Sequence, residues 1–163
     1  MALYATTDDN WKYYRYDLNE SASDFPHFES LWQRWQNKRI DGKLPAWRDF
    51  DLEDFRGWYG FIIVYDVLHN PFDLKYRLFG TEMVALFQTE YTGKTIRENN
   101  FDIEDTQDLD HFEGLLNQRK IGASSGPIYW DNRDWRNLTF LDLPLSDDGD
   151  VITHFLTTAH EIK

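Results

Sequence analysis

The sequence predicts an α+β domain built on one five-stranded antiparallel sheet, and three observations indicate this class. Two segments, 23–42 and 102–122, place apolar residues at helical spacing. Two stretches between them, 58–67 and 74–79, are rich in β-branched and aromatic residues. The chain from residue 127 onward has the composition of three further strands. Strands grouped on both sides of the helices favour antiparallel pairing over alternating parallel βα units.

Composition narrows the class of protein. The chain has 163 residues, of which 41% are apolar and 17% aromatic, enough for one packed core. A net charge of −12 opposes binding to nucleic-acid phosphates, so we expect no nucleic-acid partner. The absence of cysteine excludes disulfides, thiolate nucleophiles, zinc–thiolate sites and cysteinyl flavin adducts. No signal peptide or membrane-spanning run is present, so we expect a cytoplasmic protein with no membrane partner.

The first element that periodicity predicts is a leader helix over 24–41. Residues 1–22 precede it as an irregular arm, and residues 23–163 form the single domain. Ser23 or Asp24 can cap the start of the helix. One face of the helix is an apolar stripe, made of Phe25, Phe28, Leu31, Trp32 and Trp35. Because so large a stripe needs cover, we expect it to pack on the outer face of the sheet and against a second copy in a homodimer.

The central elements follow in order. The stretch 58–67 is apolar on both faces and predicts a central strand, and 74–79 alternates cleanly and predicts its antiparallel neighbour. Gly80 ends that strand, and a short helix is predicted over 81–87. A phosphate-binding turn at this glycine is rejected, because one glycine is too few and Glu82 would repel the phosphate.

The remaining elements are a longer helix within 102–122 and three strands within 127–135, 137–146 and 151–162. The helix carries Phe112, Leu115 and Leu116 on one face. Ser124 and Ser125 are expected in the loop that follows, and neither has a His or an acid at the spacing of a catalytic motif. The run Asp-Asp-Gly-Asp at 147–150 predicts a hairpin tip between the last two strands.

Four sequence pieces in this order resemble a PAS domain, and in particular the bacterial branch known as PAS family 5. They are "LPAWRDFD", "VYDV", "YRLFGTEMV" with "YTGK", and "LPLSDDGD", and they span roughly residues 28 to 160. The resemblance implies that the sheet is PAS-like, that the chain leaves it at Gly80, and that short helices cover its concave face. It also implies that any small-molecule ligand sits between those helices and the sheet.

On this resemblance, ten side chains are candidates for binding a ligand. They are Tyr76, Leu78, Val84, Phe87, Phe112, Leu116, Trp130, Phe140, Asp142 and His154. The alternative for the apolar members is that they fill a solid core, and the abundance of large rings favours it. We predict no cofactor.

The most specific hypothesis is that Asp142 and His154 pair across the last two strands. If residues 147–149 form a three-residue hairpin loop, Asp142 lies directly opposite His154 on one face. The pair would then be a polar hook for a ligand or a pH-sensitive latch. The alternative is an exposed ion pair that contributes little to stability, and this is the interpretation we expect. A two-residue loop would place Asp142 opposite Phe155 and separate it from His154.

Other titratable residues point to no site. His111, on the longer helix, has a counterpart that ligates haem iron in some PAS sensors, but acidic neighbours surround it and we expect it on the surface. No histidines stand at metal-ligand spacing, so no metal site is predicted. No pair of carboxylates shows a spacing typical of acid–base catalysis, and we expect no enzyme activity.

The sequence therefore favours a sensory or regulatory PAS module that acts through a small ligand and association with an unknown protein partner. No output domain is recognisable in the chain, so we expect it to stand alone. Two alternatives stay open: a ligand-free adaptor or dimerisation module, and a small enzyme on the same α+β framework. Residues 81–122 are the expected moving part.

Overall fold

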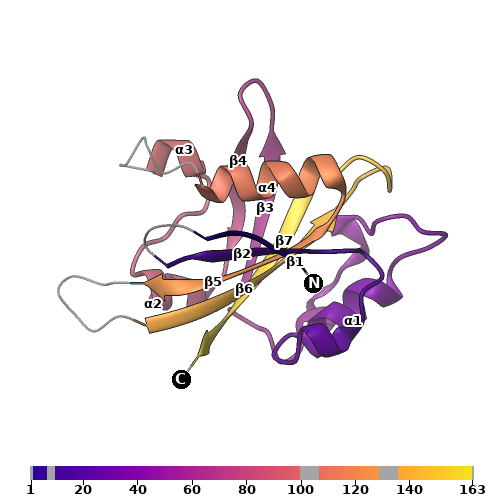
Figure 1. Ribbon diagram of the computed structural model, residues 1–163, viewed down its shortest axis with the longest axis horizontal. Helices are drawn as coiled ribbons and strands as arrows, with labels where there is room; N and C mark the ends of the chain where they lie inside the picture. Colours follow the sequence, from indigo (N-terminus) through magenta and orange to yellow (C-terminus); the bar gives the residue numbers. More distant parts are fainter. Residues whose placement is uncertain (1, 7–9, 100–106, 129–135, 163) are drawn as a thin grey trace.

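The computed structural model describes residues 2–6, 10–99, 107–128 and 136–162, and its centre is a twisted antiparallel sheet (Figure 1). Seven strands are hydrogen-bonded in the order β1-β2-β5-β6-β7-β3-β4. Their bounds are β1 (Ala2–Thr6), β2 (Lys12–Tyr16), β3 (Ile62–Leu68), β4 (Asp73–Phe79), β5 (Ile121–Ile128), β6 (Arg136–Leu145) and β7 (His154–Ile162). The prediction of an α+β fold on one antiparallel sheet is confirmed, with two strands more than expected.

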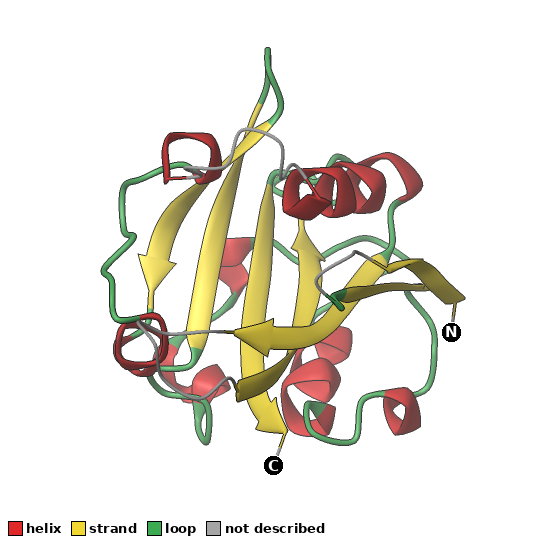
Figure 2. Ribbon diagram, turned by 60° about the vertical axis from the view of Figure 1, so that its left-hand side comes forward, coloured by secondary structure: helices red, strands yellow, loops and turns green. Residues whose placement is uncertain are grey.

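Helices cover both faces of the sheet (Figure 2). On one face lie α2 (Thr81–Phe87), α3 (Ile96–Asn99) and α4 (Gln107–Gln118). On the other lies α1 (Glu29–Asn37), accompanied by three short 3-10 turns, Ala22–Asp24, Trp47–Asp49 and Leu52–Phe55. The alternation of β6 serves both layers: Leu141, Leu143 and Leu145 are fully buried, while Phe140 and Asp142 point to the α2–α4 side.

Gly80 takes the chain out of the sheet as expected. The strand β4 ends one residue earlier, and Gly80 is the N-cap of α2. Its backbone angles, φ −63° and ψ 155°, suit any residue, so conformational freedom is not the reason for glycine here. A Cβ at position 80 would instead lie 2.6 Å from the carbonyl carbon of Gly60. The carbonyl oxygen of Gly60 accepts hydrogen bonds from the amides of Glu82 and Met83, and so fixes the turn into the helix.

The leader helix is shorter than predicted, and its apolar stripe is already covered. Instead of 24–41, α1 spans Glu29–Asn37, because the segment through Pro26 forms turns, and neither predicted cap residue caps it. All five stripe residues are at most 8% exposed. The indole nitrogen of Trp35 donates to the carbonyl oxygen of Pro144, 3.0 Å away on β6. The chain itself therefore covers the stripe, which packs against the sheet as expected. The stripe no longer argues for a homodimer through this helix, and the homodimer stays a prediction.

The predicted irregular arm is wrong as well. Within residues 1–22, β1 pairs with β2 and β2 pairs with β5, which extends the sheet at one edge. The strand expected at 127–135 lies earlier, since β5 spans Ile121–Ile128 and contains Ser124 and Ser125; residues 129–135 lie outside the described part. Both errors have one cause: β2 carries tyrosines on both faces and β5 is rich in Gly and Ser, so neither shows an apolar–polar alternation.

A search of the described residues finds no helix that is both long enough and apolar enough to span a bilayer. The predicted cytoplasmic location stays a prediction.

Candidate functional site

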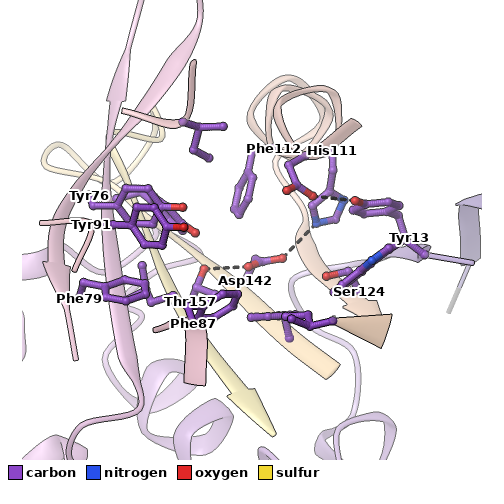
Figure 3. Close-up of a pocket in the computed structure, with 17 residues that line it drawn as sticks. Tyr13, Tyr76, Phe79, Phe87, Tyr91, His111, Phe112, Ser124, Asp142 and Thr157 are labelled. Atoms are coloured by element: carbon purple, nitrogen blue, oxygen red, sulfur yellow. Dashed lines mark hydrogen bonds and ion pairs between the residues drawn. The ribbon is translucent and has the colours of Figure 1, made fainter. Parts of the chain in front are cut away.

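A cavity of about 240 Å³ lies between the sheet and the helices α2, α3 and α4 (Figure 3). The strands β2 to β7 and the helices α2, α3 and α4 all contribute side chains to the cavity. The lining residues are Trp11, Tyr13, Ile63, Tyr65, Tyr76, Phe79, Phe87, Tyr91, Ile96, Asp108, His111, Phe112, Ser124, Ile128, Phe140, Asp142 and Thr157. The walls are mostly aromatic, and polar groups are gathered at a few points.

Asp142 is the polar centre of the cavity. It extends from β6, is only 2% exposed, and lies opposite Thr157 of β7 in the strand register. The Thr157 hydroxyl donates to Oδ1 at 2.7 Å, and Nε2 of His111 lies 3.0 Å from Oδ2. Because an ionised carboxylate only accepts hydrogen bonds, the imidazole N–H is the donor in the second contact. Both carboxylate oxygens are therefore held in place, and each keeps acceptor capacity for a further donor.

His111 contacts Asp142 over Gly122, a position without a side chain. It comes from α4 and is 1% exposed, so the expectation of a surface residue is wrong. Gly122 of β5 is the register partner of Asp142, and a Cβ there would lie 2.8 Å from Nε2 of His111. The missing side chain leaves the space through which the imidazole meets the carboxylate. The other ring nitrogen, Nδ1, is buried and has no hydrogen-bond partner among the described residues.

Tyrosines form the wall opposite His111 (Figure 3). The rings of Tyr65 and Tyr76 are 4.9 Å apart between centroids, and those of Tyr76 and Tyr91 are 5.2 Å apart and stacked. Burial raises the pKa of Tyr65 well above its usual value, and the charges of Tyr76, Asp142 and Asp108 raise it further. Burial is also the largest cause of the raised pKa of Tyr76. These hydroxyls are neutral at physiological pH and offer hydrogen bonds without charge.

A second carboxylate lies where α4 begins. Asp108 is exposed to solvent on one side and accepts a hydrogen bond of 2.6 Å from the hydroxyl of Tyr13 on β2. The ring centroids of Tyr13 and His111 are 4.9 Å apart, so the two contacts hold α4 against β2.

The structure brings together five of the ten candidate residues at this cavity: Tyr76, Phe87, Phe112, Phe140 and Asp142. Four others do not line it. Leu78 is 41% exposed, Val84 and Leu116 are partly buried against the core, and His154 lies elsewhere on β7. Trp130 lies outside the described residues.

The predicted pairing of Asp142 with His154 is wrong because the loop between β6 and β7 is longer than three residues. Pairing ends at Leu145 and His154, which leaves residues 146–153 in the loop. The carboxylate of Asp148 organises this loop, since it accepts hydrogen bonds from two backbone amides and the Ser146 hydroxyl. These bonds lower the pKa of Asp148 to about 2. His154 instead places Nε2 3.1 Å from Asp66 of β3, outside the cavity.

Sequence reasoning missed the partners of Asp142, and only a weak signal could have found them. Thr157 follows from the alternation of β7 once the true loop length is known. His111 and Gly122 are 31 and 20 residues away from Asp142 along the chain, and no motif links such positions. Among the described residues, no group of three or more His, Asp or Glu side chains could hold a metal ion.

Comparison with known proteins supports the fold. No family model matches the sequence, and no curated protein matches it either. Among solved structures, one match is a light-oxygen-voltage (LOV) domain studied with a flavin analogue, at 11% identity and a TM-score of 0.50, covering 69% of this chain and 84% of that one. LOV domains are a PAS subfamily, so the chain has a PAS-type fold.

Two further matches have lower structural scores. One is an RNA-binding LOV receptor, at 14% identity and a TM-score of 0.47, which covers 62% of this chain and 29% of that chain. The other is the light state of the Aureochrome1 LOV domain, a blue-light photoreceptor, at 9% identity and a TM-score of 0.47, covering 69% and 88%.

The residues that line this cavity do not fit a phosphorylated flavin. A flavin phosphate needs cationic or backbone donors, yet the described lining contains no Lys or Arg and includes the carboxylates Asp108 and Asp142. The volume of about 240 Å³ is also too small for the fused three-ring system of a flavin, since at the volume per atom of benzene in a cavity of about 150 Å³ it holds only about ten non-hydrogen atoms. The sequence has no cysteine to form a covalent adduct with the flavin ring.

Proposed function

We propose that this chain is a sensory PAS-type domain that binds a small molecule between its sheet and the helices α2–α4. The observation that carries the proposal is the position of Asp142, a buried carboxylate oriented by His111 and Thr157 beside an open cavity. Burying a carboxylate is costly even with partners, and a solid structural core of similar volume is served as well by apolar residues. An oriented polar group at a cavity is instead typical of ligand sites.

The size of the cavity supports a ligand in place of a packing defect. An engineered apolar cavity of about 150 Å³ binds benzene. The present cavity, of about 240 Å³, is larger and combines polar groups with aromatic walls. A single-ring or short-chain molecule would fill it.

We propose that the ligand acts by shifting the packing of α2, α3 and α4, and that a protein partner reads this change. The three helices all contribute to the cavity, through Phe87, Ile96 and His111 among others. A ligand that contacts them in one arrangement stabilises that arrangement by its difference in affinity. Since α1 buries its stripe within the chain, the partner surface is not that stripe.

We further propose that the chain belongs to the PAS family 5 branch. The support is the run "YRLFGT", which ends β4 and starts α2, together with "TGK" and "LPLSDDG" in the same order. We propose no catalytic role. His111 has no hydroxyl nucleophile at Nδ1 among the described residues, and its Nε2 is engaged by Asp142.

The proposed function is tested by native mass spectrometry of the purified full chain, followed by hydrogen exchange. We expect a bound small molecule, or a thermal shift with hits from a metabolite library, and slower exchange in α2–α4 when the ligand is present. Filling the cavity with Ser124→Phe should abolish both effects. Ser146→Ala, which changes a serine outside the cavity, is the control. Exchange that slows only outside α2–α4 would contradict the proposed site.

A further inference from the structure

The charged side chains that line the cavity in the described part of the chain are mainly acidic. Two carboxylates, Asp108 and Asp142, line it, and among the described residues no Lys or Arg does so. Within the described part of the lining, the other group able to carry positive charge is His111, which is hydrogen-bonded to Asp142. Arg15 lies on the same face of β2 as Tyr13, but its guanidinium packs against Gly114 of α4 and does not line the cavity.

Aromatic faces make up much of the remaining surface. Four rings cluster at one side of the cavity: Tyr65, Tyr76, Tyr91 and Phe79. The centroid of the Tyr76 ring lies 4.9 to 5.5 Å from the centroids of the other three. The face of an aromatic ring is negative, and several rings around one space attract a cation within about 6 Å of their centroids. Figure 3 shows Asp142 between this cluster and His111.

The pKa shifts of two tyrosines are consistent with negative charge near the cavity. After burial, the charges of Asp142 and Asp108 are among the causes that raise the pKa of Tyr65, and the charge of Asp108 contributes to the raised pKa of Tyr76. Negative charge that disfavours a phenolate at these positions would favour an ammonium group at the same place.

From this combination we propose that the cavity selects a small organic cation, a primary or quaternary ammonium compound whose charged group lies between Asp142 and the Tyr65–Tyr76–Tyr91 cluster. This inference rests on the proposed function, since it names the chemical class of the ligand bound at the same site. A primary ammonium group would donate to the acceptor capacity that Asp142 keeps, whereas a quaternary ammonium group, which has no N–H, would be attracted to Asp142 by charge alone. In both cases the carbon atoms next to the charged nitrogen would contact the rings.

The volume limits the size of this cation. At the volume per atom at which benzene occupies a cavity of about 150 Å³, the present cavity has room for about ten non-hydrogen atoms. A benzylammonium or choline-sized molecule fits within that limit, whereas a nucleotide does not.

The test compares probes that differ in charge and little in shape. Benzylammonium, benzyl alcohol and benzoate share one ring, and choline and 3,3-dimethylbutan-1-ol share one branched skeleton. Calorimetric titration of the full chain at neutral pH should show each cation binding about tenfold more tightly than its neutral analogue, and benzoate not binding.

Variants of the two carboxylates sharpen the test. Asp142→Asn keeps the side-chain shape and removes the charge. It should therefore weaken the binding of benzylammonium about tenfold and change the affinity for benzyl alcohol little. Asp108→Asn can still accept the hydrogen bond from Tyr13 and should weaken the binding of benzylammonium to a smaller extent. This variant provides the test of charge if Asp142→Asn does not fold. Asp150→Asn removes the same charge in the β6–β7 loop and should leave binding unchanged.

Each outcome decides the proposal separately from the proposed function. If benzyl alcohol or benzoate binds as tightly as benzylammonium, the cation inference is overturned while a small-ligand site stands. If neither cation binds at millimolar concentration, the cation inference is overturned, and native mass spectrometry still tests the site. Equal losses in Asp142→Asn and Asp150→Asn would show long-range charge and contradict a direct contact.

Discussion

The hydrogen bond from Thr157 to Asp142 offers a sharp test of how the buried carboxylate is held. Thr157→Val removes the hydroxyl and keeps the shape of the side chain. The neighbouring residue provides the control: Thr158 is equally buried, points to the other face of the sheet, and donates to the carbonyl oxygen of Phe61 at 2.9 Å. The two substitutions differ mainly in whether the lost acceptor is charged or neutral.

The expected magnitudes follow from that difference. A buried hydrogen bond to a charged group contributes about 1.5–3 kcal/mol, and one between neutral groups about 0.5–1.5 kcal/mol. Thr157→Val, which loses a 2.7 Å bond to Asp142, should therefore lower the free energy of unfolding by about 1 kcal/mol more than Thr158→Val, the difference between the middles of the two ranges. For a chain of this length, each kcal/mol corresponds to about 2–4 °C in the thermal midpoint.

Urea unfolding followed by tryptophan fluorescence measures both variants on one scale. Repeating Thr157→Val in an Asp142→Asn background should reduce its cost to about that of a neutral bond, because the acceptor is then uncharged. The reasoning would be refuted if the valine at 157 cost no more than the valine at 158. It would also be refuted if the cost stayed the same in the Asp142→Asn background.

Three further outcomes are expected. Gly80→Ala should destabilise the fold by about 1–3 kcal/mol or prevent folding, since its Cβ would meet the Gly60 backbone, and urea unfolding measures this. Gly122→Ala should displace His111 from Asp142, and the imidazole NMR signals of His111 should move. The lowered pKa of Asp148, about 2 against 3.8, means that its stabilisation is present above about pH 4 and lost as the pH falls towards about 2. Asp148→Asn should therefore show a smaller drop in thermal midpoint than the natural chain on going from about pH 5 to about pH 2.5.

Local pattern predicted most of the elements around the cavity. The alternation of residues 74–79 and the glycine after them define β4 and the start of α2, and the helix over Thr81–Phe87 is confirmed. The five aromatic and aliphatic residues near α1 are buried as their spacing predicts. These features depend on residues close in sequence, where periodicity and turn chemistry act directly.

The candidate site was predicted only in part, because its polar centre joins distant segments. Phe140 and Asp142 share a face of β6, as alternation requires, and both line the cavity. The partners of Asp142 depend on the length of the β6–β7 loop and on where α4 lies over β5. Neither the loop length nor the helix position is set by local propensity. The sequence therefore predicted His154 as the partner of Asp142, whereas the structure has Thr157.

The order of residues by itself determined the class of fold, the break at Gly80 and the aromatic character of the cavity, since these follow from short-range pattern and composition. Only the tertiary structure decided that His111 meets both Tyr13 and Asp142, that β1 and β2 extend one edge of the sheet, and that the apolar stripe near α1 is buried within the chain. The physical reason is that side-chain contacts between segments depend on strand register and helix placement, which are set by packing of the whole chain.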